Sequence, residues 1–216
     1  PQTCRKCWNE ERAGRTSKRM HTLDRLKHIL GDQTWTQDAK PLIFLDLKLG
    51  NICNLKCRIC GSFSSSKWAA EEIAMYKNNK VARDNLERGQ WPRQSQEFWV
   101  DLANIMKDVR YIEFTGGEPF LIDEHFDLLA YIVEQDLAKN IEIHYNTNGT
   151  QYPCEAEEIW TNFKLVEVAF SIDNVGKRFE YERYGANWEE VQQNIFQFNK
   201  LKEHHKNLIT QLCLTV

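Results

Sequence analysis

The sequence has no apolar run that approaches the roughly 18 residues of a membrane-spanning helix. It also lacks a marked excess of one charge, since the formal net charge at pH 7 is -3. We therefore expect neither a membrane nor a nucleic acid as its partner. No signal peptide opens the chain, so we expect a cytoplasmic, reducing location in which the seven cysteines hold metal rather than form disulfides.

Between Cys60 and His125 the sequence has neither cysteine nor histidine. This gap matters because Cys53, Cys57 and Cys60 form a compact C-x3-C-x2-C group directly after a strand-like run. A closed zinc site needs four protein ligands, so a local zinc site is not completed. A cubane iron-sulfur cluster has four irons, and three cysteines would leave one iron open to another ligand. The group therefore indicates a reactive metal cluster rather than a purely structural metal site.

The rest of the composition is typical of a soluble globular protein, with 42% apolar and 27% charged residues among 216. The chain begins at Pro1 and stops at Val216 inside an apparent strand, so we expect a C-terminally incomplete piece of a longer protein. Three parts are expected: a cysteine-containing segment over 1–30, a polar linker over 31–40, and a core over 41–216.

Strand-like and helical segments alternate through the core, which predicts parallel βα units and an α/β fold. Strands are expected near residues 42–49, 110–115, 140–147, 164–172 and 208–216. Helices are expected near residues 64–78, 94–108, 123–138, 155–162 and 187–204.

The expected strands alternate apolar and polar residues, although a parallel strand covered on both faces is apolar throughout. Asp46 and Lys48 interrupt the first strand, and Glu142 and His144 interrupt the third. A barrel with a polar lumen accounts for this pattern. Such a lumen could hold a polar ligand.

Short motifs follow four of these strands where each strand ends. They are Asn51–Cys60, Thr115-Gly-Gly-Glu-Pro119, Asn146-Thr-Asn-Gly149 and Ser171-Ile-Asp173. Each alone could be an ordinary turn or strand end. Active sites of βα barrels are built at the C-terminal ends of the strands, so the four together predict one site there.

The cysteine spacing, with the apolar Ile59 before the third cysteine, resembles the signature of the radical S-adenosylmethionine (SAM) enzymes. This resemblance implies a partial (β/α)6 TIM-like barrel and a 4Fe-4S cluster on Cys53, Cys57 and Cys60. It also implies SAM on the open iron, reductive SAM cleavage, and a reducing partner such as a flavodoxin or ferredoxin. Hydrogen would then be taken from a peptide or a polar small-molecule substrate.

The same resemblance assigns the remaining motifs to SAM. The turn of Thr115, Gly116, Gly117, Glu118 and Pro119 would receive the methionine amino group, with the glycines allowing a close backbone approach. Ser171 and Asp173 would reach the ribose, Asn146 and Asn148 would make polar contacts, and Ile59 would pack near the adenine.

Cys4 and Cys7, followed by Trp8, resemble the end of a twitch module, which carries an auxiliary iron-sulfur cluster. Two cysteines cannot hold a cubane alone, so the other ligands are expected upstream. A zinc knuckle with His21 or His28, or free thiols, are the alternatives.

Two other functions stay open at this stage. An iron-sulfur electron carrier would use a closed cluster without SAM, and a zinc-stabilised structural protein would need a fourth ligand.

Overall fold

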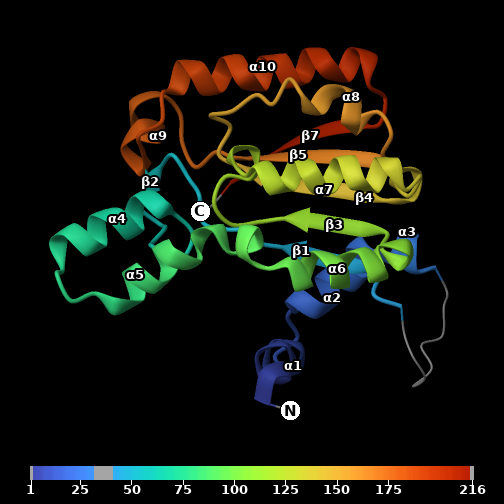
Figure 1. Cartoon of the computed structure of the whole chain (residues 1–216), viewed down its shortest axis with the longest axis horizontal. Coiled ribbons are helices and arrows are strands. Elements are labelled where there is room, and N and C mark those ends of the chain that lie inside the picture. Colours follow the sequence, from blue (N-terminus) through green and yellow to red (C-terminus); the bar gives the residue numbers. More distant parts are fainter. Residues whose placement is uncertain (1, 32–40, 215–216) are drawn as a thin grey trace. The chain divides into compact units, whose positions relative to one another are not determined.

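The computed structural model describes residues 2–31 and 41–214 (Figure 1). The chain divides into two compact units, Pro1–Lys40 and Pro41–Val216, which are described separately. Apart from Gly31, the predicted linker over 31–40 lies outside the described residues.

The first unit contains the short helix η1 (Gln2–Cys4) and the helices α1 (Arg5–Arg12), α2 (Lys18–Arg25) and α3 (Lys27–Leu30). Ser17 caps α2, because its side chain accepts a hydrogen bond from the backbone nitrogen of Met20. Glu11 of α1 accepts hydrogen bonds from Ser17 and Arg19, both at 2.5 Å. These contacts join α1 to the start of α2.

The second unit is built on a five-stranded parallel sheet, as the strand and helix pattern predicts. Its strands are β1 (Phe44–Leu47), β3 (Tyr111–Phe114), β4 (Glu142–Thr147), β5 (Leu165–Ser171) and β7 (Leu208–Cys213). Their order is β1-β3-β4-β5-β7, and every neighbouring pair is parallel. The architecture is that of a partial TIM-like barrel, which confirms the predicted fold class.

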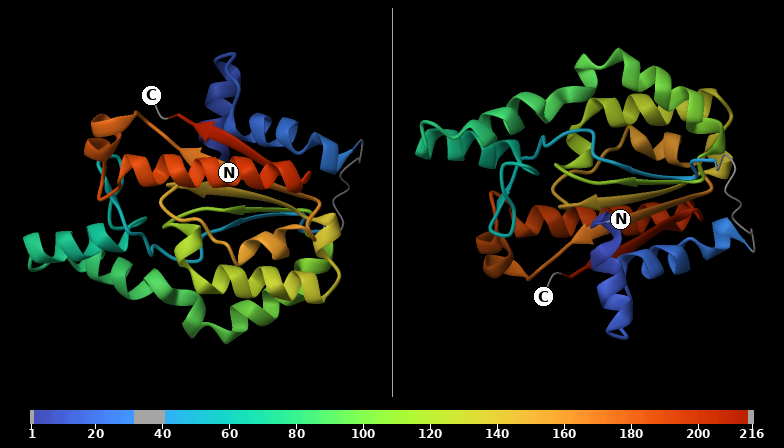
Figure 2. Two further views of the ribbon diagram at one scale, coloured as in Figure 1. Left: turned by 90° about the horizontal axis from the view of Figure 1, so that it is seen from above. Right: turned by 90° about the horizontal axis from the view of Figure 1, so that it is seen from below.

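Helices pack against one face of this sheet (Figure 2). They are α6 (Gln96–Ile105), α7 (Asp123–Glu134), α8 (Ala156–Trp160) and α10 (Trp188–His204), with the short helices η3 (Met106–Asp108), η4 (Pro119–Leu121) and η5 (Ala138–Asn140). Ile143 and Tyr145 of β4 are buried in the core with Ile132 of α7 and Phe198 of α10. The apolar positions of the alternating strands therefore face the helices.

The alternate positions of the strands carry the polar residues, as predicted. Four polar residues are register partners on neighbouring strands: Asp46 on β1, Glu113 on β3, His144 on β4 and Glu167 on β5. His144 Nδ1 lies 2.9 Å from Glu167 Oε2. The polar side chains of neighbouring strands thus pair with one another along this face of the sheet.

The loops at the C-terminal ends of the strands contain the helix predicted near residues 64–78 and several elements that the sequence pattern missed. The predicted helix is α4 (Ser66–Met75), which packs with the unpredicted α5 (Lys80–Glu87) beyond the ends of the strands (Figure 1, left), followed by η2 (Arg88–Gln94). Helix α9 (Gly176–Glu182) and the two-residue strands β2 (Lys56–Cys57) and β6 (Arg183–Tyr184) lie at the same end. Within the described ranges, no helix combines the length and the apolar character that a membrane crossing requires.

Candidate functional site

The three clustered cysteines lie on a loop that leaves the end of β1. Cys57 is part of β2, and the backbone nitrogen of Cys60 donates to the carbonyl oxygen of Cys57 at 3.0 Å, which closes a turn. The start of α4 holds this loop: the Ser65 hydroxyl donates to the Leu55 carbonyl at 2.6 Å, and the Trp68 indole donates to the Cys57 carbonyl at 2.9 Å. All three cysteines are free thiols.

Two of these sulfurs have hydrogen-bond donors beside them. The backbone nitrogen of Leu55 lies 3.5 Å from Cys53 Sγ, and Asn148 Nδ2 lies 3.8 Å from the same sulfur. Arg183 Nη1 lies 3.8 Å from Cys57 Sγ. Asn148 comes from the end of β4 and Arg183 from β6, so two remote segments donate to the cysteine loop.

Burial sets the acidity of these thiols. It raises the pKa of Cys53 to about 11, and it raises the pKa of Cys57 against the lowering effect of the Arg183 guanidinium. Both thiols therefore keep their protons at neutral pH until a metal binds. Metal binding at this loop would release those protons, since the thiolate is the ligand form.

The Thr115–Pro119 turn follows β3 and packs on the segment that enters the cysteine loop. Gly116 and Gly117 have φ angles of +75° and +61°, a region that favours glycine. The backbone nitrogen of Glu118 donates to the Ile52 carbonyl at 2.7 Å. A Cβ atom at Gly117 would lie 2.4 Å from that carbonyl oxygen, so the close approach here is to the protein's own backbone.

We expect Gly117→Ala to damage the cysteine loop more than Gly116→Ala does. Both changes carry a similar strain of about 1–2 kcal/mol from the positive φ angle. At Gly116 the new Cβ would meet the flexible Lys48 side chain, which can move, whereas at Gly117 it meets the Ile52 backbone. Thermal midpoint and iron bound per chain measure the difference, and equal values for the two variants would contradict it.

Glu118 of this turn has a fully buried side chain that faces protein donors. Its carboxylate accepts hydrogen bonds from the Thr147 hydroxyl and the Asn148 backbone nitrogen, both at 2.8 Å. Burial raises its pKa to about 7, although these donors act in the opposite direction. Glu118 therefore ties the end of β3 to the end of β4, and through Asn148 to Cys53.

The other predicted site residues lie at the same ends of the strands. Thr115 donates to Asp46 at 2.6 Å, and Asn146 donates to Glu113 at 3.3 Å. Ile59, between the second and third cysteines, is 68% exposed.

The two polar residues of the Ser171–Asp173 motif differ in burial and in their partners. Ser171 is partly exposed at the end of β5. Asp173 Oδ2 pairs with Arg183 Nη2 at 2.7 Å, while its Oδ1 is buried and has no hydrogen-bond partner among the described residues. Arg183 lies in a charged stretch that gives no sequence signal of a site, and sequence reasoning missed it.

The N-terminal pair lies in the first unit. Cys4 is exposed at the start of α1, and Cys7 is partly buried within this helix. Among the described residues, no three His, Cys, Asp or Glu side chains are arranged around a single metal ion. A cubane cluster requires a different arrangement, because each of its thiolate ligands binds a different iron.

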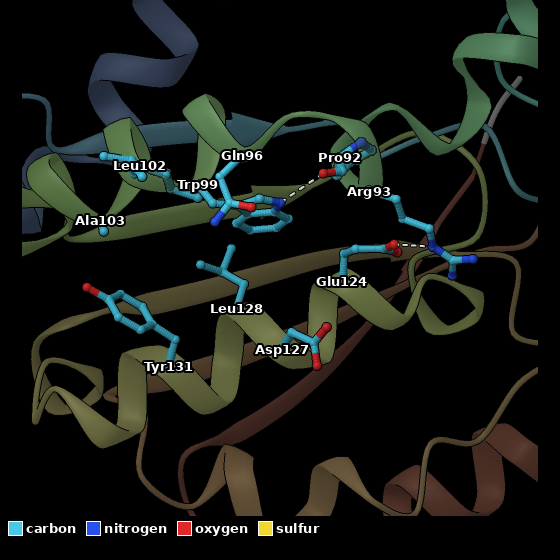
Figure 3. A pocket seen from close by; sticks show the side chains of 11 residues that line it. Pro92, Arg93, Gln96, Trp99, Leu102, Ala103, Glu124, Asp127, Leu128 and Tyr131 are labelled. Carbon is cyan, nitrogen blue, oxygen red and sulfur yellow. Dashed lines mark hydrogen bonds and ion pairs between the residues drawn. The ribbon is translucent and has the colours of Figure 1, made fainter.

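A pocket lies away from the cysteine loop, between η2 and α6 on one side and α7 on the other (Figure 3). It has a volume of about 660 Å³ and is lined by Trp99, Leu102, Leu128 and Tyr131, with the Arg93–Glu124 ion pair at one end. A smaller pocket of about 170 Å³ lies beside the cysteine loop, lined by Lys48, Asn51 and Phe63 among others. We place the candidate site at the cysteine loop, because the chemically reactive side chains gather there.

The solved structures that match this chain include native anSMEcpe with bound AdoMet, at 19% identity and a TM-score of 0.45, covering 81% of this chain and 43% of that chain. Another is Streptococcus suis SuiB bound to S-adenosylmethionine, at 14% identity and a TM-score of 0.41, covering 92% of this chain and 51% of that chain. The chain thus spans about half or less of the length of these proteins. A search of curated proteins gives no match.

The profile of the Radical SAM superfamily matches residues 47–212. This match begins in β1 and ends in β7, so it includes the cysteine loop and all four motifs at the strand ends. Because it spans more than half of the 216 residues, the chain belongs to the Radical SAM superfamily.

Proposed function

We propose that this chain holds a 4Fe-4S cluster on Cys53, Cys57 and Cys60 and binds SAM beside it, as the catalytic core of a radical SAM enzyme. The observation that carries the proposal is the packing of the Gly116–Gly117 turn against the segment that enters a loop of three free thiols. When bound, the cluster and SAM supply an electron and the 5'-deoxyadenosyl radical that abstracts hydrogen. The donor set fits the cluster, since three thiols leave one iron open.

Residues around the loop would each bind a different part of SAM. The carbonyls of the Thr115–Pro119 turn would accept from the methionine amino group. Ser171 and the unpartnered Oδ1 of Asp173 would accept from ribose hydroxyls, and Asn146 would add a polar contact. The exposed Ile59 would cover the adenine, which burial of apolar surface favours.

We also propose a polar substrate, either a peptide or a polar small molecule. The support is the polar face of the sheet, which carries Asp46, Glu113, His144 and Glu167 in register. A flavodoxin or ferredoxin would supply the electron. An auxiliary iron-sulfur cluster that includes Cys4 and Cys7 stays part of the proposal.

Anaerobic reconstitution with iron and sulfide tests this function. The protein should take up iron and acid-labile sulfide in equal amounts, and its reduced electron paramagnetic resonance (EPR) spectrum should change when SAM is added. 5'-Deoxyadenosine should then form under reducing conditions. Zinc in place of iron would contradict the proposal, and a cluster whose spectrum ignores SAM would indicate an electron carrier instead.

A further inference from the structure

Arg183 lies against the cysteine loop although the two are far apart in the sequence. It belongs to β6, which pairs antiparallel with β2 so that Arg183 is the register partner of Cys57. The pairing continues where the backbone nitrogen of Arg58 donates to the Glu182 carbonyl at 2.8 Å. The Arg183 residue is 6% exposed, so its guanidinium group is held inside the protein.

The guanidinium group joins two residues of the candidate site. Its Nη2 lies 2.7 Å from Asp173 Oδ2, and its Nη1 lies 3.8 Å from Cys57 Sγ. The planar fork of arginine allows both contacts at once, and the single ammonium group of lysine would not reproduce them. One buried cation therefore connects the acid after β5 to a cluster ligand.

Both contacts have electrostatic consequences. A buried arginine needs a partner to offset its desolvation, and Asp173 provides one. The second contact places donor hydrogens and positive charge at a sulfur, and hydrogen bonds to the sulfurs and net charge set the potentials of iron-sulfur clusters. Reduction adds one electron and no proton, so a nearby cation favours the reduced form.

We propose that Arg183 is a positioning residue that orients Asp173 at the strand end and, through Cys57, raises the reduction potential of the cluster. This inference rests on the proposed function, because it requires a cluster on Cys57. It adds to the site a residue outside the cysteine and glycine motifs. It also predicts that removing Arg183 and removing Asp173 change the reduction potential in opposite directions. Removing the cation disfavours reduction, and removing the anion favours it.

The test is an EPR-monitored redox titration of the reconstituted protein without SAM, at matched iron content. For Arg183→Met we expect the ratio of reduced to oxidised cluster at a fixed potential to fall about tenfold, a shift of about 59 mV for one electron. For Asp173→Asn we expect a shift in the opposite direction. Arg183→Lys keeps the charge without the fork, so its shift should be smaller than that of Arg183→Met.

Arg93→Met is the matched control. Arg93 is also an arginine held in an ion pair, since its Nη2 lies 3.0 Å from Asp123 Oδ2 and its Nε donates to Glu124. The described contacts of its side chain are with these two acids and do not include a cysteine sulfur. Its loss should leave the potential unchanged.

The outcomes separate this inference from the proposed function. Wild-type protein without a cluster would contradict the function itself. A wild-type cluster whose potential is the same in Arg183→Met would overturn the role of Arg183. If Arg183→Met does not retain iron, Asp173→Asn and Arg183→Lys decide, and unchanged potentials in both would overturn the inference.

Discussion

Cys57→Ala should reduce iron at the cysteine loop and 5'-deoxyadenosine formation to background. Cys57 is the most buried of the three thiols and lies within β2, held by Trp68 on one side and β6 on the other. An alanine offers no ligand atom, and water has little access to replace it. Two remaining cysteines would then have to hold a cubane, for which they are too few.

The matched control for this change is Cys154→Ala. Cys154 is an exposed free thiol whose sulfur lies 3.6 Å from Glu155 Oε2, away from the cysteine loop in the sequence. This variant should bind iron and cleave SAM as the wild type does. Iron and sulfide at wild-type levels in Cys57→Ala, with an EPR signal that still responds to SAM, would contradict the ligand assignment.

The placement of the motifs could be predicted because it depends on local pattern. Each motif follows a strand whose apolar positions alternate, and the C-terminal ends of parallel strands meet at one edge. The alternation also predicts which face of β4 packs on helices, with Ile143 and Tyr145 in the core and His144 opposite. Both are properties of short segments, so one sequence is sufficient to predict them.

The contacts between the motifs could not be predicted. Asn148 reaches Cys53 across 95 residues, and Arg183 reaches Cys57 across 126. The strands β2 and β6 that bring Cys57 and Arg183 together have two residues each, too few to show a period. Helix α9 buries only Phe179 among seven residues, so it carries no apolar stripe.

Glu118 illustrates a different limit. Its position in the turn was predicted, and the resemblance assigned the whole turn to the methionine end of SAM. The side chain is nevertheless fully buried among Thr147, Asn148 and Phe120. A motif identifies the segment that forms a site, but the direction of each side chain depends on the packing of remote strands.

Glu118→Ala is therefore expected to destabilise the site through protein contacts. The Asn148 nitrogen and the Thr147 hydroxyl would lose their acceptor in a buried position, at about 1–3 kcal/mol each. Since Asn148 also donates to Cys53, iron retention should fall together with stability. Urea unfolding and iron content measure both, and unchanged values would show that Glu118 does not join the two strand ends.

Glu118→Gln tests the same carboxyl group through pH. The folded pKa of about 7 lies above the ordinary value of 4.5, so the native state binds more protons than the unfolded state between these values. The contribution of Glu118 to stability is then fully present below pH 4.5 and is lost as pH rises through 7, by about 3 kcal/mol. We expect the free energy of unfolding of the wild type, relative to Glu118→Gln, to fall by that amount across this interval.

The exposed Glu134, at the end of α7, supplies the control Glu134→Gln, which should follow the wild-type profile. Parallel profiles for the wild type and Glu118→Gln would show that burial does not raise the pKa of this carboxyl group.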